Sequence, residues 1–266
     1  MNWNQLISAK RFGMEEFHEE RQENRSEFQR DYDRLIFSAP FRRLQNKTQV
    51  FPLPGSVFVH NRLTHSLEVA SVGRSLGDDV AKALLERHPE LQDSFLPEIG
   101  SIVSAACLAH DLGNPPFGHS GEKAISTFFS EGKGVRLKEK QPNGEQLSPM
   151  EWEDLIHFEG NANAFRILTH QFEGRRKGGF VLTYTTLASI VKYPFSSSLA
   201  GTKSKFGFFV SEEESFRKIA TELGLILLNE HPLKYARHPL VYLVEAADDI
   251  CYQMMDIEDA YKLKIL

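Results

Sequence analysis

A histidine and an aspartate, His110 and Asp111, stand side by side where an apolar run over 102–109 ends. A second histidine, His119, follows after a turn rich in glycine and proline. Imidazole and carboxylate groups bind divalent metals and transfer protons, and the end of a purely structural helix needs neither. This stretch therefore predicts a metal site that other parts of the chain must complete.

Two further residues are candidate ligands for that metal. His65 falls in the first turn of one predicted helix, and Asp248 falls within the apolar face of another. A carboxylate on an apolar face is costly to bury unless it is paired or coordinated. Together with His110 and Asp111 they form a mixed nitrogen and oxygen set, which favours manganese, magnesium or ferrous iron over structural zinc. An ordinary core or surface position is the alternative for any single histidine.

A candidate acid–base pair follows the same turn. His119 and Glu122 are three residues apart at the start of a predicted helix, so their side chains can share a face. A carboxylate beside an imidazole orients the ring and raises its basicity, as in a general base. The alternative is a surface pair in which Glu122 only complements the helix dipole.

Charged and aromatic side chains supply candidates for contact with a substrate. Arg62 opens a predicted helix and is placed to reach an anion. Lys192 ends an apolar helix, where a lysine is also a routine partner of the helix dipole. Tyr252 and Asp256 follow Asp248 at i+4 and i+8 and so lie on the same helical face. A core tyrosine and a solvated aspartate are the alternatives for these two.

Helical periodicity dominates the elements that must position these residues. The predicted helices cover 62–87, 97–110, 149–168, 211–228 and 238–260. Alternating patterns typical of strands are scarce, so the sequence predicts an all-α fold with only minor short β elements near 47–60. Residues 194–207 lack periodicity and are predicted to be mobile surface. No internal repeat or domain boundary is visible, and we expect a single domain over 1–266.

Composition sets the broad class of the protein. The chain has 266 residues, 41% of them hydrophobic and 25% charged, with a net charge of −5. These values are ordinary for a globular protein and argue against general affinity for nucleic acid. No apolar run approaches the roughly 18 residues of a membrane span, and no signal peptide is visible. The two cysteines lie in apolar surroundings and indicate a reducing compartment, so we expect a cytoplasmic protein.

Five blocks of sequence resemble the deoxyguanosine triphosphate triphosphohydrolase family of the HD phosphohydrolase superfamily. In chain order they are residues 41–51, 62–69, 109–122, 158–162 and 245–250. The resemblance implies an HD-domain helical bundle and cleavage of a deoxynucleoside triphosphate, dGTP above all, into deoxynucleoside and inorganic triphosphate. It also implies that the H…HD…D residues named above are the metal ligands.

The resemblance assigns roles to the remaining candidates. It makes His119 and Glu122 the catalytic pair that activates a water for attack on the α-phosphorus. It places Gln49 at the 3′-hydroxyl of the deoxyribose and Lys192 at the triphosphate. Tyr252 would stack on the sugar and Asp256 would accept from its 3′-hydroxyl.

Alternatives remain open at this point. Another HD phosphohydrolase, such as a nucleotidase or a cyclic-dinucleotide phosphodiesterase, would use the same ligands. A nucleotide-sensing subunit would bind without turnover. The resemblance further implies a homo-oligomer, leaves regulation by a nucleotide or single-stranded DNA open, and predicts a C-terminal lobe beyond the last residue of this chain.

Overall fold

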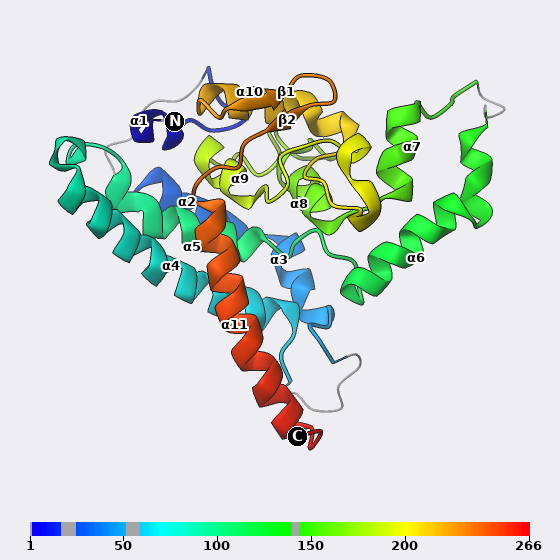
Figure 1. Ribbon diagram of the computed structural model, residues 1–266, viewed down its shortest axis with the longest axis horizontal. Helices are drawn as coiled ribbons and strands as arrows, with labels where there is room; N and C mark the ends of the chain where they lie inside the picture. The colour runs from blue at the N-terminus through cyan, green and yellow to red at the C-terminus, as the bar shows by residue number, and fades with distance from the viewer. Residues whose placement is uncertain (1, 17–24, 52–58, 140–143) are drawn as a thin grey trace.

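The computed structural model describes residues 2–16, 25–51, 59–139 and 144–266 (Figure 1). Its α-helices are α1 (Trp3–Leu6), α2 (Glu27–Ile36), α3 (Ala39–Arg43), α4 (Arg62–Arg87), α5 (Ile99–Ala109), α6 (Gly118–Ser130), α7 (Pro149–Ile156), α8 (Gly160–Thr169), α9 (Tyr184–Ile190), α10 (Glu213–Glu222) and α11 (Val241–Lys262). Short 3₁₀ helices are η1 (Leu44–Asn46), η2 (Pro89–Leu91), η3 (Leu96–Glu98), η4 (Lys133–Lys138), η5 (Ser197–Leu199), η6 (Gly201–Lys203) and η7 (Val210–Glu212).

The predicted all-α class is confirmed, and β structure is minor. Between 47 and 60 the described residues hold an isolated antiparallel bridge that joins Thr48 to Asn61, while 52–58 lie outside the described residues. A two-stranded antiparallel sheet of β1 (Leu227–Asn229) and β2 (Lys234–Tyr235) was not predicted.

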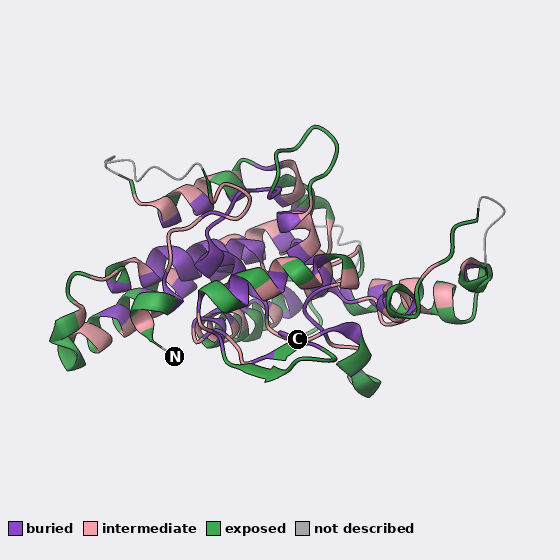
Figure 2. Ribbon diagram, turned by 90° about the horizontal axis from the view of Figure 1, so that it is seen from above, coloured by how far each residue is buried: buried purple, intermediate pink, exposed green. Residues whose placement is uncertain are grey.

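Helix α5 forms the centre of the molecule. All of its residues are buried, and α4, α2, α9 and α11 pack around it. Figure 2 shows this concentration of buried residues in the middle of the fold. Helix α4 approaches closely because it carries glycine there: a Cβ on Gly73 would lie 2.6 Å from Cys107 Sγ. The close packing of α5 therefore fixes the position of its last turn and of His110, which follows it.

Two predicted helices are shorter than the sequence indicated. The helix predicted over 149–168 is broken into α7 and α8, because the buried carboxylate of Glu159 accepts from the backbone of Asn161 and Ala162 and starts a new helix. The helix predicted to reach 228 ends at Glu222. Gly224 adopts a left-handed conformation, with φ of +64°, in a Schellman arrangement that closes α10.

The segment 194–207 is only partly exposed, which corrects the sequence prediction: 198–199 and 201–202 are exposed, whereas 194, 196–197, 200 and 206–207 are buried. Phe206 is fully buried and packs with Ala162 and Ala200 in a small cluster beside the main core. The surrounding serine, glycine and lysine residues gave no sign that Phe206 is buried. Its burial fixes the chain next to Lys205.

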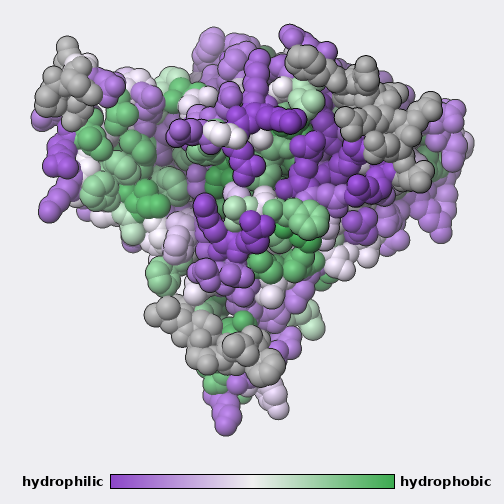
Figure 3. Space-filling view, turned by 180° about the vertical axis from the view of Figure 1, so that it is seen from behind, coloured by the Kyte–Doolittle hydropathy of each residue, from purple (hydrophilic) through white to green (hydrophobic). Residues whose placement is uncertain are grey.

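Two parts of the fold extend from the body. One is the lobe of α6, η4 and α7, where Figure 3 shows hydrophobic side chains gathering on the face seen from behind. The other is the C-terminal half of α11, which points away from the core (Figure 1). In the described part of the chain, no helix combines the length and the apolar character that crossing a membrane requires.

Candidate metal centre and its cavity

The four predicted ligands meet at one place although they come from distant parts of the sequence. His65 lies in the first turn of α4, His110 and Asp111 follow α5, and Asp248 lies on α11. His65 Nε2 lies 2.9 Å from Asp248 Oδ1, and the rings of His65 and His110 are 5.3 Å apart. Ligand atoms of His65, His110 and Asp111 all lie within 4.8 Å of one another. The geometry thus brings two imidazoles and two carboxylates together.

The hydrogen bonds of His110 leave one ring nitrogen for a metal. Its Nδ1 donates to the carbonyl of Cys107 at 2.6 Å. This bond fixes the tautomer, so that Nε2 carries the lone pair. Nε2 is buried and has no hydrogen-bond partner in the described part of the chain; it lies 3.6 Å from Asp248 Oδ1 and 3.7 Å from Asp111 Oδ1. A buried nitrogen without a partner, facing two carboxylates, fits a divalent cation.

The electrostatics of the cluster also favour a cation. Burial would raise the pKa of Asp111, but His110 and Arg62 outweigh it and lower that pKa. Burial likewise opposes ionisation of Asp248, yet the hydrogen bond with His65 and the nearby His110 lower its pKa to about 2. Burial would lower the pKa of His110, but Asp111 and Asp248 raise it. Two ionised carboxylates therefore attract positive charge, and a metal would compete with a proton for the lone pair of His110 Nε2.

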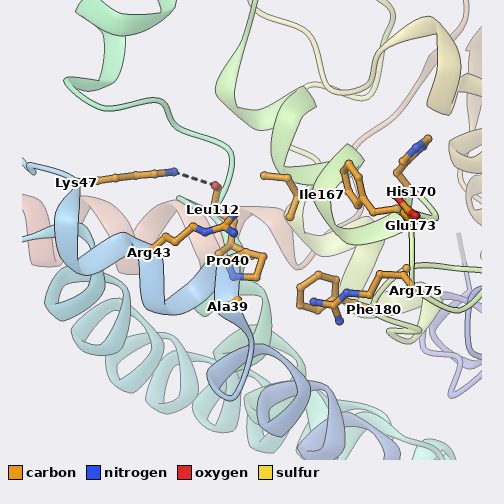
Figure 4. Close-up of a pocket in the computed structure, with 12 residues that line it drawn as sticks. Ala39, Pro40, Arg43, Lys47, Leu112, Ile167, His170, Glu173, Arg175 and Phe180 are labelled. Atoms are coloured by element: carbon orange, nitrogen blue, oxygen red, sulfur yellow. Dashed lines mark hydrogen bonds between the residues drawn. The ribbon is translucent and has the colours of Figure 1, made fainter.

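The loop after Asp111 is tied down from both sides. The side chain of Asn114 donates to Asp111 Oδ1, and Arg62 Nη1 donates to Asp111 Oδ2 at 2.6 Å. The loop also borders a cavity of about 360 Å³, which is separate from the site and is drawn in Figure 4. From its wall Lys47 Nζ donates to the carbonyls of Asn114 at 2.6 Å and Leu112 at 3.3 Å. These bonds hold the Asp111 carboxylate in one orientation.

The predicted acid–base pair forms as expected from its spacing. Phe117 and Gly118 both have positive φ, 66° and 52°, and turn the chain into α6. His119 Nδ1 then lies 2.7 Å from Glu122 Oε2. Glu122 is buried, and its other oxygen accepts from the backbone N–H of Gly160 at 2.8 Å. The His119 side chain is 85% exposed, so the carboxylate orients a ring that remains accessible.

One cavity of about 550 Å³ joins the ligand cluster to this pair. Of the predicted substrate contacts, Gln49, Arg62, Lys192 and Tyr252 line it. Asp256 does not line it and instead shares a side-chain hydrogen bond with Tyr252.

Besides His110, two lining residues have buried polar atoms that find no hydrogen-bond partner among the described residues. These atoms are Gln49 Oε1 and Arg62 Nε. Lys192 Nζ, in contrast, lies 2.9 Å from Glu245 Oε1. The cavity thus offers an unpaired acceptor and an unpaired donor to a polar ligand.

Sequence reasoning missed a cation in this cavity. Lys205 lines it, with Nζ 2.8 Å from Glu159 Oε1 and 3.7 Å from Glu122 Oε2. Burial would lower the pKa of Lys205, but Glu159 raises it, so the ammonium stays charged. The side chain of Asn161 also donates to Glu159, the residue that caps α8. No spacing rule marks Lys205, because it lies in an aperiodic segment.

Comparison with known proteins gives a consistent result. A family model described as the HD domain matches residues 62–176. The whole chain aligns at 45% identity with a deoxyguanosinetriphosphate triphosphohydrolase-like protein of Synechocystis sp. and at 46% with one of Pseudomonas aeruginosa. It aligns at 36% identity with a deoxyguanosinetriphosphate triphosphohydrolase of Yersinia enterocolitica. The chain covers 61%, 58% and 56% of the length of these three relatives.

Proposed function

The chain belongs to the deoxyguanosinetriphosphate triphosphohydrolase-like family of HD-domain proteins, and we propose that it hydrolyses deoxynucleoside triphosphates, with dGTP the first substrate to test. The products would be the deoxynucleoside and inorganic triphosphate. The observation that carries the proposal is that one cavity holds both the His/Asp cluster and the accessible His119 supported by Glu122. A phosphoester hydrolase needs both, a cationic centre for the phosphate and a base for water.

The metal would be held by His65, His110, Asp111 and Asp248. Nitrogen and oxygen donors without thiolate favour manganese, magnesium or ferrous iron. A metal bound there supplies Lewis-acid polarisation of a phosphoryl oxygen and lowers the pKa of water. Arg62 supports the site from outside, because its guanidinium holds the second oxygen of Asp111.

His119 would act as the general base. Glu122 fixes the ring through Nδ1, which leaves Nε2 to take a proton from the attacking water. The water oxygen joins the α-phosphorus as the bond to the 5′ oxygen breaks. The 5′ oxygen takes up a proton, in net terms the one removed from the water, so that the nucleoside leaves as an alcohol and the three phosphates leave together as triphosphate. The carboxylate of Glu122 stays beside the ring of His119 during these steps, because the backbone N–H of Gly160 also holds it in place.

Cations around the cavity would balance the triphosphate. Lys205 and Lys192 line the cavity, and both have raised pKa values because nearby carboxylates, Glu159 and Glu245, outweigh burial. Arg62 contributes an unpaired Nε. Phosphoryl transfer depends largely on such positioning and charge neutralisation.

The sugar contacts proposed here rest on two side chains. Gln49 offers a buried amide oxygen without a partner, suited to accept from a sugar hydroxyl. Tyr252 lines the same cavity and would stack on the sugar, with Asp256 hydrogen-bonded behind it. An amide oxygen close to the 3′ position and a flat ring beside it would leave little room for a 2′-hydroxyl.

Product analysis tests this proposal directly. The protein is incubated with dGTP and Mn²⁺, and the products are separated by anion exchange. Deoxyguanosine with equimolar triphosphate supports the proposal. Orthophosphate would indicate a different HD phosphohydrolase, and binding without product would indicate a nucleotide sensor. The variant His110→Ala should lose metal and turnover together, while His88→Ala, at an exposed site beyond α4, should keep both.

A further inference from the structure

Among the residues that the structure describes, few side chains hold the outer half of α11 to the rest of the protein. Beyond Cys251 the helix points away from the core (Figure 1), and most of its residues are exposed. The buried residues in this half are Met255, Asp259 and Ala260. Met255 reaches the candidate ligand His65, with Sδ 3.5 Å from Nδ1. The position of this helix half therefore depends on contacts with the start of α4.

One of those contacts is unusually specific. Asp259 is only 4% exposed, and His60 occupies both of its oxygens. The backbone N–H of His60 donates to Oδ2 and its ring Nδ1 lies against Oδ1, each at 2.9 Å. The other ring nitrogen lies 3.2 Å from Glu68 Oε1 on α4. We call this arrangement of His60, Asp259 and Glu68 the His60 clasp.

The clasp lies about two helical turns from Tyr252, the residue of this helix half that lines the cavity. Asp256 precedes Asp259 by three positions, and Tyr252 precedes Asp256 by four, so the three lie along one side of α11. Tyr252 and Asp256 share a side-chain hydrogen bond, and Tyr252 lines the cavity. A rotation or outward shift of this helix half would move both together.

We propose that His60 is a positioning residue, which fixes the outer half of α11 and thereby sets the cavity-lining Tyr252, together with its hydrogen-bond partner Asp256, in place for the sugar of the substrate. This inference rests on the function proposed above. His60 itself is not among the residues that line the cavity. Its effect passes through Asp259, because a carboxylate that is buried in this way requires a fixed donor.

The charges around His60 explain why a histidine suits the clasp. Asp259 and Glu258 face it from α11 together with Asp256, and Glu68 faces it from α4. All are acidic. Burial would lower the pKa of His60, but the hydrogen bond with Asp259 and the charge of Glu68 raise it. The ring also places one nitrogen against each of two carboxylates, Nδ1 at Asp259 and Nε2 at Glu68, so one side chain contacts both.

Kinetics with a matched set of variants test the clasp. His60→Ala removes the donors, whereas His60→Arg supplies a cation whose fork can reach both carboxylates. We expect His60→Ala to raise KM for dGTP roughly tenfold, the scale of one charge-assisted hydrogen bond, with kcat changed less than about threefold. His60→Arg should recover most of this loss. His88→Ala, another histidine next to a glutamate, should match the wild type.

A double-mutant comparison separates positioning from general damage. In the Tyr252→Ala background, His60→Ala should add little to KM, because the cavity-lining residue through which the helix position acts is already lost. Additive losses in the double variant, or a fall in kcat with KM unchanged, would overturn the proposal. If His60→Ala fails to fold, Glu68→Gln tests the proposal instead, because it weakens only the contact between His60 and Glu68.

Hydrogen exchange provides a readout that does not depend on turnover. Amides over 252–262 should exchange faster in His60→Ala than in the wild type, and His60→Arg should restore protection. Unchanged exchange in His60→Ala would refute the clasp even if dGTP hydrolysis were established. If the wild type does not hydrolyse dGTP but the exchange result holds, the proposed function fails while the structural role of His60 stands.

Discussion

Arg62 Nη1 donates to Asp111 Oδ2 at 2.6 Å, and both side chains are buried. The sequence suggested Arg62 as a contact for an anionic substrate, and it does line the cavity. The ion pair with Asp111 gives Arg62 a second role. It holds one carboxylate oxygen in place, so that the other can face the neighbouring imidazoles.

This relationship predicts a combined loss of metal and substrate binding in Arg62→Lys. A lysine keeps the charge but cannot span Asp111 and the cavity together. We expect metal affinity or activity to fall about 10- to 100-fold, the usual effect of changing a residue that orients a ligand. Isothermal titration with Mn²⁺ measures the first quantity and initial rates with dGTP measure the second. Arg87→Lys, at the opposite end of α4, serves as the control, and wild-type values in both assays would contradict the role.

A second prediction separates catalysis from metal binding. Glu122→Gln keeps the shape of the side chain but removes the charge that supports a protonated His119. We expect kcat to fall about 10²- to 10⁴-fold, the range for loss of general-base catalysis. Metal content should remain at the wild-type level, because Glu122 is not a ligand in the proposed set. Steady-state kinetics measure kcat and elemental analysis measures the metal content, with Glu153→Gln on α7 as the control. A variant that retains wild-type kcat would remove His119 and Glu122 from the mechanism.

A third prediction concerns Lys205, the cation that sequence reasoning missed. Lys205→Met should raise KM for dGTP, because one of the charges that meets the triphosphate is lost. Inhibition by deoxyguanosine, which carries no phosphate, should be unchanged. Circular dichroism is needed beside the kinetics, since Glu159 is fully buried and loses its cation in this variant. Lys123→Met on α6 is the matched control. Equal effects on dGTP and deoxyguanosine would place Lys205 elsewhere than at the phosphates.

The ligand cluster could be predicted from the sequence because its residue types conflict with their surroundings. Asp248 sits on an apolar helical face, and His110 follows a helix that is apolar all round, so each demands a partner. The central helix was recognisable for the same reason. A helix that is hydrophobic on every side is stable only where other elements surround it, at the centre of the fold.

What the sequence could not supply depends on tertiary contacts. The break between α7 and α8 exists because Glu159 is buried and paired with Lys205, and neither the burial nor the pairing leaves a periodic signal. Lys205 itself is placed by Phe206, whose partner Ala162 lies more than forty residues earlier. Periodicity detects which face of one helix is apolar, but not which distant residue a loop will meet.

The last prediction concerns pH and the buried His238. Its Nε2 donates to the carbonyl of Leu6 at 3.1 Å, and its Nδ1 accepts from the backbone N–H of Leu240 at 3.2 Å. This pattern requires the neutral ring, and burial lowers the pKa of His238 from 6.5 to about 4. Between these two pH values the unfolded chain binds a proton that the folded chain does not. The contribution of His238 to stability is therefore constant above about pH 7 and declines as the pH falls from 6.5 towards 4.

The loss from this one group reaches about 3 kcal/mol when the full shift is counted. Urea unfolding of the wild type and of His238→Gln at a series of pH values measures it. Glutamine can donate and accept in the same place but does not titrate, so the difference in unfolding free energy between the two proteins should change over this interval and be flat above it. Asp154, whose pKa is raised by burial to about 6, titrates in both proteins and cancels in the difference. A difference that does not vary with pH would show that His238 is protonated in the folded state.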